Sequence, residues 1–147
     1  METTFEPNLD VKEFRRALPL FPTGVAILTT VSEEGVPVGL SCNSFSSVSL
    51  DPPLVSWGLR KESRAASAFR NGKGFAINIL AGSQQGLSGR FASSTIANKF
   101  EGVAWDAGIN GLPVLRDCAA TYECSPFAVH DGGDHWLFLG QVRRFEH

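Results

Sequence analysis

Apolar runs alternate with short polar turns along most of this chain, a pattern typical of a fold built from strands. Val25–Val31 is a continuous β-branched and apolar run, which predicts a buried strand. The turn at Glu33–Gly35 separates it from a second strand that is expected to begin at Val36, so this pair is predicted to form a hairpin. Leu54–Leu59 and Phe75–Leu80 are predicted to be the next two strands.

The last part of the chain is predicted to form a second hairpin. Cys118–Val129 and His135–Val142 are predicted strands, and Asp131–Asp134 between them is a turn signal. Residues 92–115 show little regular pattern and are expected to form a long loop. The total is about six strands.

Short helices are expected at three places. Asp10 is a candidate N-cap for a helix that Pro19 and Pro22 would stop. Ser63 is a candidate N-cap for a second helix, and Ser83 is expected to open a third. In the first helix, the apolar residues fall on one face: Val11, Phe14, Ala17 and Leu18.

These elements predict a mainly β, antiparallel fold, a small barrel with two or three short helices over its openings. The strands lie too close together in sequence for the helical crossovers of a parallel sheet. The chain has 147 residues, the size of one domain, and its 15 glycines and 8 prolines disfavour a bundle of long helices.

Charge and cysteine content exclude several classes of protein. The net charge of −2 argues against bulk electrostatic capture of nucleic acid. No apolar run is long enough for a membrane span, and Met1–Asp10 lacks the features of a signal peptide. The three cysteines are an odd number without a C-x-x-C pair, which indicates reduced thiols and a cytoplasmic location.

Two polar segments are candidate ligand sites. The Ser-rich stretch Ser41–Ser49 would line one strand face with hydroxyls and amides, although a solvated edge strand has the same pattern. Arg60–Arg64 lies at a strand-to-helix junction, where a hydroxyl, cations and free N–H groups suit a phosphate; an ordinary capped helix is the alternative. Arg90, next to Phe91, is a candidate for a further cation. The standard glycine-rich nucleotide loops are absent.

The third candidate is the turn Gly133–His135. A histidine beside an aspartate at the start of a strand can orient its ring toward a bound substrate, and a plain turn histidine is the alternative. A metal site is disfavoured, because neighbouring members of the acidic and histidine cluster at 130–135 would point to opposite faces of a strand. No nucleophile with a recognisable base is present.

Several segments together resemble the flavin reductase-like, FMN-binding split-barrel family, and the match runs from about Phe14 to Phe145. The segments occur in the family's order with similar spacing: Phe21–Val25, Pro37–Phe45, Ser47–Leu54, Phe75–Leu80, Arg90–Ala92, Phe100–Val103 and Gly133–His135.

The resemblance implies a split β-barrel homodimer of single domains spanning residues 1–147. It also implies an NAD(P)H-dependent reductase that passes hydride to FMN or FAD and supplies reduced flavin to a partner monooxygenase. By the same resemblance, His135 is the catalytic residue, near the nicotinamide or flavin ring. The residues implied to bind the flavin are Ser41, Cys42, Asn43, Ser44, Ser47, Val48, Ser49, Pro52, Ser63, Arg64, Arg90 and Phe91. No metal, nucleic acid or membrane is implied.

This chain departs from the family pattern in three places. Ser41–Ser44 replaces a common Thr-Ala-Asn-Ser and keeps the hydroxyl, while Ala65 replaces a second hydroxyl near the phosphate. Family members usually continue beyond the position of His147 through one more strand, which is expected to be missing here. Two other functions stay open, a non-catalytic flavin- or haem-binding protein and an oxidase or monooxygenase with tightly bound FMN.

Overall fold

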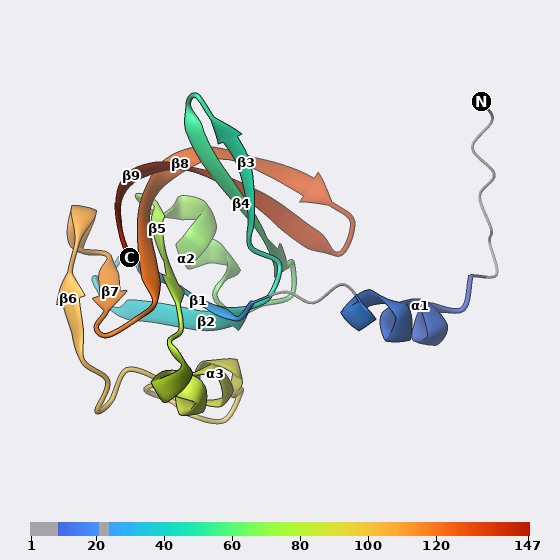
Figure 1. Cartoon of the computed structure of the whole chain (residues 1–147), viewed down its shortest axis with the longest axis horizontal. Coiled ribbons are helices and arrows are strands. Elements are labelled where there is room, and N and C mark those ends of the chain that lie inside the picture. The colour runs from blue at the N-terminus through green and yellow to red at the C-terminus, as the bar shows by residue number, and fades with distance from the viewer. Residues whose placement is uncertain (1–8, 21–23) are drawn as a thin grey trace.

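The computed structural model describes residues 9–20 and 24–147 and is dominated by one antiparallel sheet (Figure 1). The sheet has seven strands in the order β2-β1-β5-β8-β9-β4-β3. Their bounds are β1 Ala26–Val31, β2 Pro37–Cys42, β3 Ser46–Leu50, β4 Pro53–Arg60, β5 Phe75–Ile79, β8 Ala120–Gly132 and β9 His135–Glu146. The predicted mainly β, antiparallel class is confirmed. The hydrogen-bonded order is that of an open sheet and not of a closed barrel.

Three α-helices accompany this sheet in the described ranges: α1 (Val11–Ala17), α2 (Ala66–Asn71) and α3 (Gln85–Ala92). Asp10 caps α1 as predicted, because its Oδ1 accepts the N–H groups of Lys12 and Glu13 at 3.0 and 3.3 Å. The prediction that Pro22 stops this helix, and the Phe21–Thr23 part of the first family segment, lie outside the described residues. One-turn 3₁₀ helices span Leu18–Leu20, Gly82–Gln84 and Ile109–Gly111.

The prediction that Ser63 is an N-cap was wrong by two positions. Ala65 occupies the cap of α2, and the Ser63 Oγ instead accepts the N–H of Ala65 at 3.2 Å within the preceding turn. The hydroxyl satisfies its neighbour's backbone before the helix begins, so the helix starts later than the side-chain type suggested.

The long loop predicted over residues 92–115 contains two short strands, β6 (Trp105–Ala107) and β7 (Pro113–Leu115), which pair with each other. A buried polar network holds them against the main sheet. Asn78 Oδ1 accepts the N–H of Leu115 at 2.9 Å, and the Thr29 hydroxyl donates to the Pro113 carbonyl. Strands of three residues are too short to leave a periodic signal, so their position depends on these distant partners.

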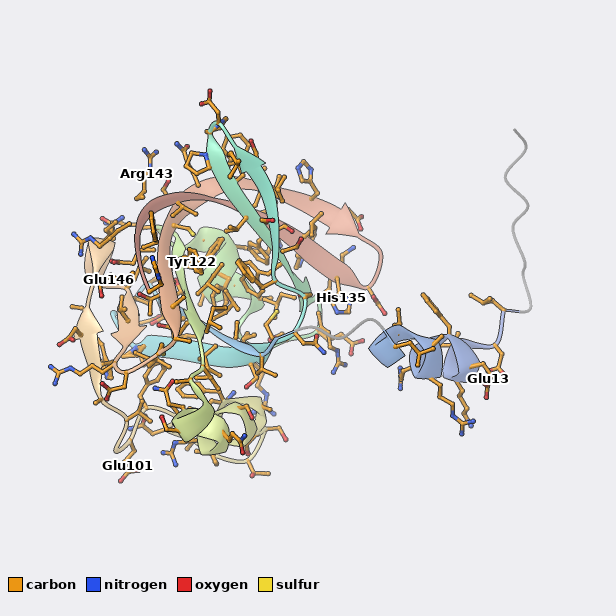
Figure 2. All side chains as sticks on the ribbon, in the orientation of Figure 1. Glu13, Glu101, Tyr122, His135, Arg143 and Glu146 are labelled. Atoms are coloured by element: carbon orange, nitrogen blue, oxygen red, sulfur yellow. The ribbon has the colours of Figure 1, made fainter. Side chains whose placement is uncertain are left out.

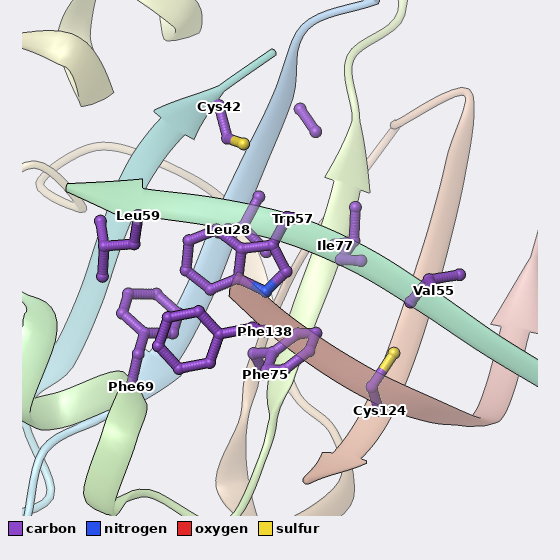
Figure 3. Close-up of a cluster of buried hydrophobic side chains, with 11 residues drawn as sticks. Leu28, Cys42, Val55, Trp57, Leu59, Phe69, Phe75, Ile77, Cys124 and Phe138 are labelled. Atoms are coloured by element: carbon purple, nitrogen blue, oxygen red, sulfur yellow. The ribbon is translucent and has the colours of Figure 1, made fainter. Parts of the chain in front are cut away.

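The main core lies between the sheet and α2 and is rich in aromatic rings (Figure 3). Trp57 on β4 is fully buried and stacks on Phe138 of β9 with ring centroids 4.7 Å apart. Phe69 of α2 and Phe75 of β5 meet the Trp57 indole edge-on at 4.9 and 5.6 Å. A second cluster, around Phe91 and Phe100, packs α3 and the following loop onto the sheet.

None of the helices described here has the length and hydropathy that crossing a bilayer requires.

Candidate functional site

A large open cavity of about 1740 Å³ lies along the outer edge of β2. It is bounded on one side by the turn that leads into α2 and on the other by α3 and the loop that follows it. Eight of the residues implied by the family resemblance line it: Ser41, Cys42, Asn43, Ser44, Ser63, Arg64, Phe91 and His135. The fold therefore brings together segments that are up to 94 positions apart.

The edge of β2 offers unpaired main-chain groups to this cavity. β2 ends the strand order, so its outer edge pairs with no strand in the ranges 9–20 and 24–147. The Gly39 carbonyl accepts a hydrogen bond from the Lys99 side chain and thus points away from β1. Since alternate residues of an antiparallel strand point the same way, Ser41 also turns its N–H and C=O outward. Such an edge can pair with the donors and acceptors of a planar ring.

The hydroxyls after β2 are already positioned by the protein. Ser41 Oγ donates to the Ser88 carbonyl of α3 at 2.6 Å. Ser44 Oγ accepts the Gly58 N–H of β4 at 2.9 Å and lies 3.0 Å from the buried Cys42 Sγ. The Asn43 side chain is exposed at the cavity. These bonds leave Asn43 and the β2 backbone as the groups with the most freedom to meet a ligand.

Gly58 lies between Ser44 and His135. A Cβ atom at Gly58 would lie 3.6 Å from Ser44 Oγ and 3.6 Å from His135 Cδ2. His135 opens β9 opposite Arg60 of β4, and Figure 2 shows it where the β8–β9 hairpin passes the end of β4. Both groups therefore lie within ordinary van der Waals contact of the position that a side chain at 58 would occupy.

Asp134 orients the His135 ring. Its Oδ1 lies 2.7 Å from His135 Nδ1, which leaves Nε2 for a ligand. This hydrogen bond, together with the charge of the imidazole, lowers the pKa of the Asp134 carboxyl. The carboxyl therefore stays ionised at pH values below those at which an ordinary aspartate is protonated. The neighbouring Asp131 binds Lys61 at 2.8 Å and takes no part in the His135 pair.

Arg64 is a free cation at the same end of the cavity. Arg60 pairs with Glu62 at 3.4 Å and Lys61 pairs with Asp131, but no hydrogen bond or ion pair to Arg64 occurs within the described part of the chain. Its side chain is exposed and borders the cavity beside the half-buried Ser63. This pairing of a cation with a hydroxyl suits a phosphate.

Five of the implied residues do not reach this cavity. Ser47, Val48 and Ser49 lie on β3 at the opposite end of the strand order, and Pro52 lies in the turn after it. Ser47, Val48 and Pro52 are exposed, as in the alternative of a solvated edge strand. Arg90 is the fifth.

The Arg90 guanidinium is occupied by the protein itself. It donates to the carbonyls of Asn98, Lys99 and Glu101 at 3.0, 2.6 and 2.9 Å. Its neighbour Phe91 is fully buried and packs edge-on against Phe100 at 5.0 Å. Arg90 thus fixes the loop after α3, a role that residue type alone did not indicate. The same loop places Lys99 in the cavity wall, which sequence reasoning missed because an isolated lysine in an irregular segment carries no signal.

Arg90→Lys is expected to destabilise the protein by about 1–3 kcal/mol, because one ammonium cannot reproduce the three guanidinium hydrogen bonds in their fixed fork. The measurement is urea unfolding followed by circular dichroism, with Arg15→Lys on exposed α1 as the matched control. An unfolding free energy equal to that of the Arg15→Lys control would contradict the assigned role.

Comparison with known proteins gives the family. Residues 17–147 match the model described as the flavin reductase like domain. The chain is 43% identical to FMN reductase (NADH) SmoA of Agrobacterium fabrum over 92% of this chain and 76% of that protein. It is also 43% identical to the reductase subunit HsaB of a flavin-dependent monooxygenase from Rhodococcus jostii, over 91% of this chain and 68% of that protein. It spans 44% of a probable flavin reductase of Rhizobium meliloti.

A solved structure agrees with the sequence matches. The NADH:FAD oxidoreductase SgcE6 of Streptomyces globisporus, in complex with NAD and FAD fragments, superposes with a TM-score of 0.87 at 33% identity. The alignment covers 99% of this chain and 86% of that one. The chain therefore belongs to the flavin reductase-like domain family.

Proposed function

We propose that this protein is an NAD(P)H-dependent flavin reductase that transfers hydride from a reduced nicotinamide to FMN or FAD. The observation that carries the proposal is that one cavity joins the outer edge of β2, the exposed Arg64 and the His135 ring that Asp134 orients. Family membership and relatives named as flavin reductases support the same activity.

The residues present fit a flavin. The main-chain groups at the β2 edge match the alternating donors and acceptors of the isoalloxazine pyrimidine edge, and Ser63 with Arg64 would hold the flavin phosphate. The cavity is large enough for a flavin and a nicotinamide together.

Bound flavin supplies the hydride acceptor, so the chain itself needs no nucleophile. Its task is to bring two rings face to face, because hydride moves only between atoms in near contact. His135 Nε2 is available to hydrogen-bond the carboxamide of the nicotinamide. The hydrogen bond from His135 Nδ1 to the Asp134 carboxylate keeps the imidazole in one orientation.

The activity is tested by mixing the purified protein with NADH or NADPH and with FMN, FAD or riboflavin, and following the loss of nicotinamide absorbance at 340 nm. Oxidation that depends on both the protein and added flavin is expected. Absence of oxidation in every pairing would contradict the proposal. Turnover that needs only a non-exchanging bound flavin would instead identify an oxidase or monooxygenase.

Removing Arg64, the cation proposed to bind the flavin phosphate, gives a specific prediction. Arg64→Ala is expected to weaken FMN binding roughly 10- to 100-fold, because a charge-assisted hydrogen bond contributes about 1.5–3 kcal/mol. Riboflavin binding, which lacks the phosphate, is expected to stay within about 2-fold. Quenching of flavin fluorescence measures both affinities, and Arg15→Ala controls for the loss of one positive charge. An unchanged ratio of FMN to riboflavin affinity would place the phosphate elsewhere.

We further propose that the curved sheet acts as a split barrel in a homodimer of single domains spanning residues 1–147. The hydrogen bond between Ser44 and Gly58 ties the segment after β2 to β4 and narrows the gap between the ends of the sheet. Phe127, Val129 and Leu137 on the β8–β9 hairpin are 40–51% exposed, which favours burial against a second copy. The three free cysteines fit a cytoplasmic location.

An oxygenase that receives the reduced flavin is the proposed partner, since several relatives are named as reductase subunits or components of monooxygenases. The proposed transfer is by diffusion of reduced flavin between the two proteins.

A further inference from the structure

Lys99 is held with its charged end at the edge of β2. Its Nζ donates to the carbonyls of Phe91 at 2.8 Å and Gly39 at 3.4 Å, and the side chain lines the cavity. Phe91 lies in the last turn of α3, where the helix dipole favours a cation. These contacts fix the ammonium at the wall of the cavity.

The backbone beneath this side chain is also fixed. Arg90 donates to the carbonyl of Lys99 itself and to those of Asn98 and Glu101 on either side. Lys99 is therefore a preorganised cation and not a mobile surface lysine.

The charge of Lys99 has no anionic partner among the residues that the structure describes. None of the ion pairs found in residues 9–20 and 24–147 includes it, and its two acceptors are neutral carbonyls. Partial burial lowers the pKa of the ammonium, as expected for a charge that the protein does not neutralise. A ligand that brings negative charge to this point would supply the missing partner.

Lys99 and Arg64 reach the cavity from different sides. Arg64 belongs to the turn before α2, and Lys99 follows α3; Figure 1 shows α2 and α3 on opposite sides of the β1–β2 pair. With the flavin phosphate at Ser63 and Arg64, a ring that lies along the β2 edge extends toward Gly39 and Lys99. This step rests on the proposed function.

We propose that Lys99 is a further catalytic residue, which faces the N1–C2=O edge of the flavin and stabilises the negative charge of the reduced ring. In the reaction, the C4–H bond of the dihydronicotinamide breaks and an N5–H bond of the flavin forms. Two electrons move with the hydride, so the nicotinamide becomes oxidised and cationic. The reduced flavin gains one negative charge at N1–C2=O, and no other oxidant or proton donor is needed.

The oxidised ring is neutral, so the Lys99 ammonium interacts more strongly with the product than with the starting flavin. An interaction that strengthens as charge develops accelerates the step and does not only tighten binding. The affinity for reduced flavin should therefore depend on Lys99 more than the affinity for oxidised flavin does.

The test uses Lys99→Gln, which keeps hydrogen-bond donors for the two carbonyls and removes the charge, beside Lys99→Arg, which keeps the charge. Dissociation constants of oxidised FMN and of anaerobically reduced FMN are measured for each full-length protein. Lys99→Gln is expected to weaken binding of reduced FMN about 10-fold or more and that of oxidised FMN by about 2-fold. Lys99→Arg is expected to stay within about 3-fold of the wild type for both. Thermal unfolding of each variant verifies that the fold is retained.

Equal weakening of the oxidised and reduced forms would overturn the proposal. Weakening that affects FMN and spares riboflavin would overturn it as well, by assigning Lys99 to the phosphate. If the wild type oxidises NAD(P)H and Lys99→Gln binds reduced flavin as tightly as the wild type, the proposed role of Lys99 is wrong and the proposed function stands. A wild type that neither binds flavin nor oxidises NAD(P)H would remove the proposed function.

Discussion

Replacing His135 with alanine is expected to raise KM for the nicotinamide substrate about 10- to 50-fold and to leave the affinity for flavin within about 3-fold. The imidazole is held by Asp134 at the end of the cavity beside Gly58, where its free Nε2 meets the hydride donor in the proposed arrangement. Loss of one oriented hydrogen bond to a ligand costs about 1–2 kcal/mol, and the site also loses an aromatic wall. Steady-state kinetics with varied NADH, together with fluorescence titration of FMN, measures the two effects separately.

His147→Ala is the matched control, because His147 is an exposed histidine after β9 that does not border the cavity. It is expected to behave as the wild type. Asp134→Asn should give an intermediate rise in KM, since the ring stays in place but loses its charged hydrogen-bond partner. Equal loss of nicotinamide and flavin binding in His135→Ala would contradict the assignment of this residue to the donor side.

Trp57→Ala is expected to lower the free energy of unfolding by about 3–5 kcal/mol, the largest stability effect foreseen here. The indole is fully buried and contacts rings from α2, β5 and β9, so its removal opens a cavity where three elements meet. Domains of this size are stable by about 5–15 kcal/mol, so the substitution would remove a large share of the total stability. Urea unfolding followed by circular dichroism measures the change.

Trp57→Phe is the control for this substitution. The Trp57 Nε1 atom is buried without a hydrogen-bond partner within the described residues, so phenylalanine removes an unsatisfied donor together with part of the ring. The variant is expected to lose about 1–2 kcal/mol, clearly less than Trp57→Ala. Equal losses for alanine and phenylalanine would show that packing of the ring is not the source of the stability.

The sequence was most informative where local chemistry decides the structure. The apolar run that forms β1 and the turn signal at Asp131–Asp134 predicted their elements correctly. β6 and β7 could not be predicted, because their place depends on Asn78 and Thr29, which are 37 and 84 positions from their partners. β3 was also not counted as a separate strand, because its serine-rich sequence lacks an apolar run, so the number of strands was underestimated. The class of the fold was not affected.

In the candidate site, too, residue type identified some of the residues, and only the folded chain shows the others. The segments Ser41–Ser44 and Ser63–Arg64 could be selected by residue type, and the fold brings them to one cavity. Arg90 was selected by the same reasoning, but only the folded chain shows that three carbonyls occupy its guanidinium. Lys99 was missed, because the position of its ammonium in the cavity wall depends on carbonyls of Gly39 and Phe91 that the sequence does not show to be close.

The most direct test of the account is a crystal structure of this protein grown with FMN. The isoalloxazine is expected along the outer edge of β2, with its phosphate at Ser63 and Arg64. An isoalloxazine ring bound outside this cavity, or a phosphate bound away from Arg64, would contradict the account.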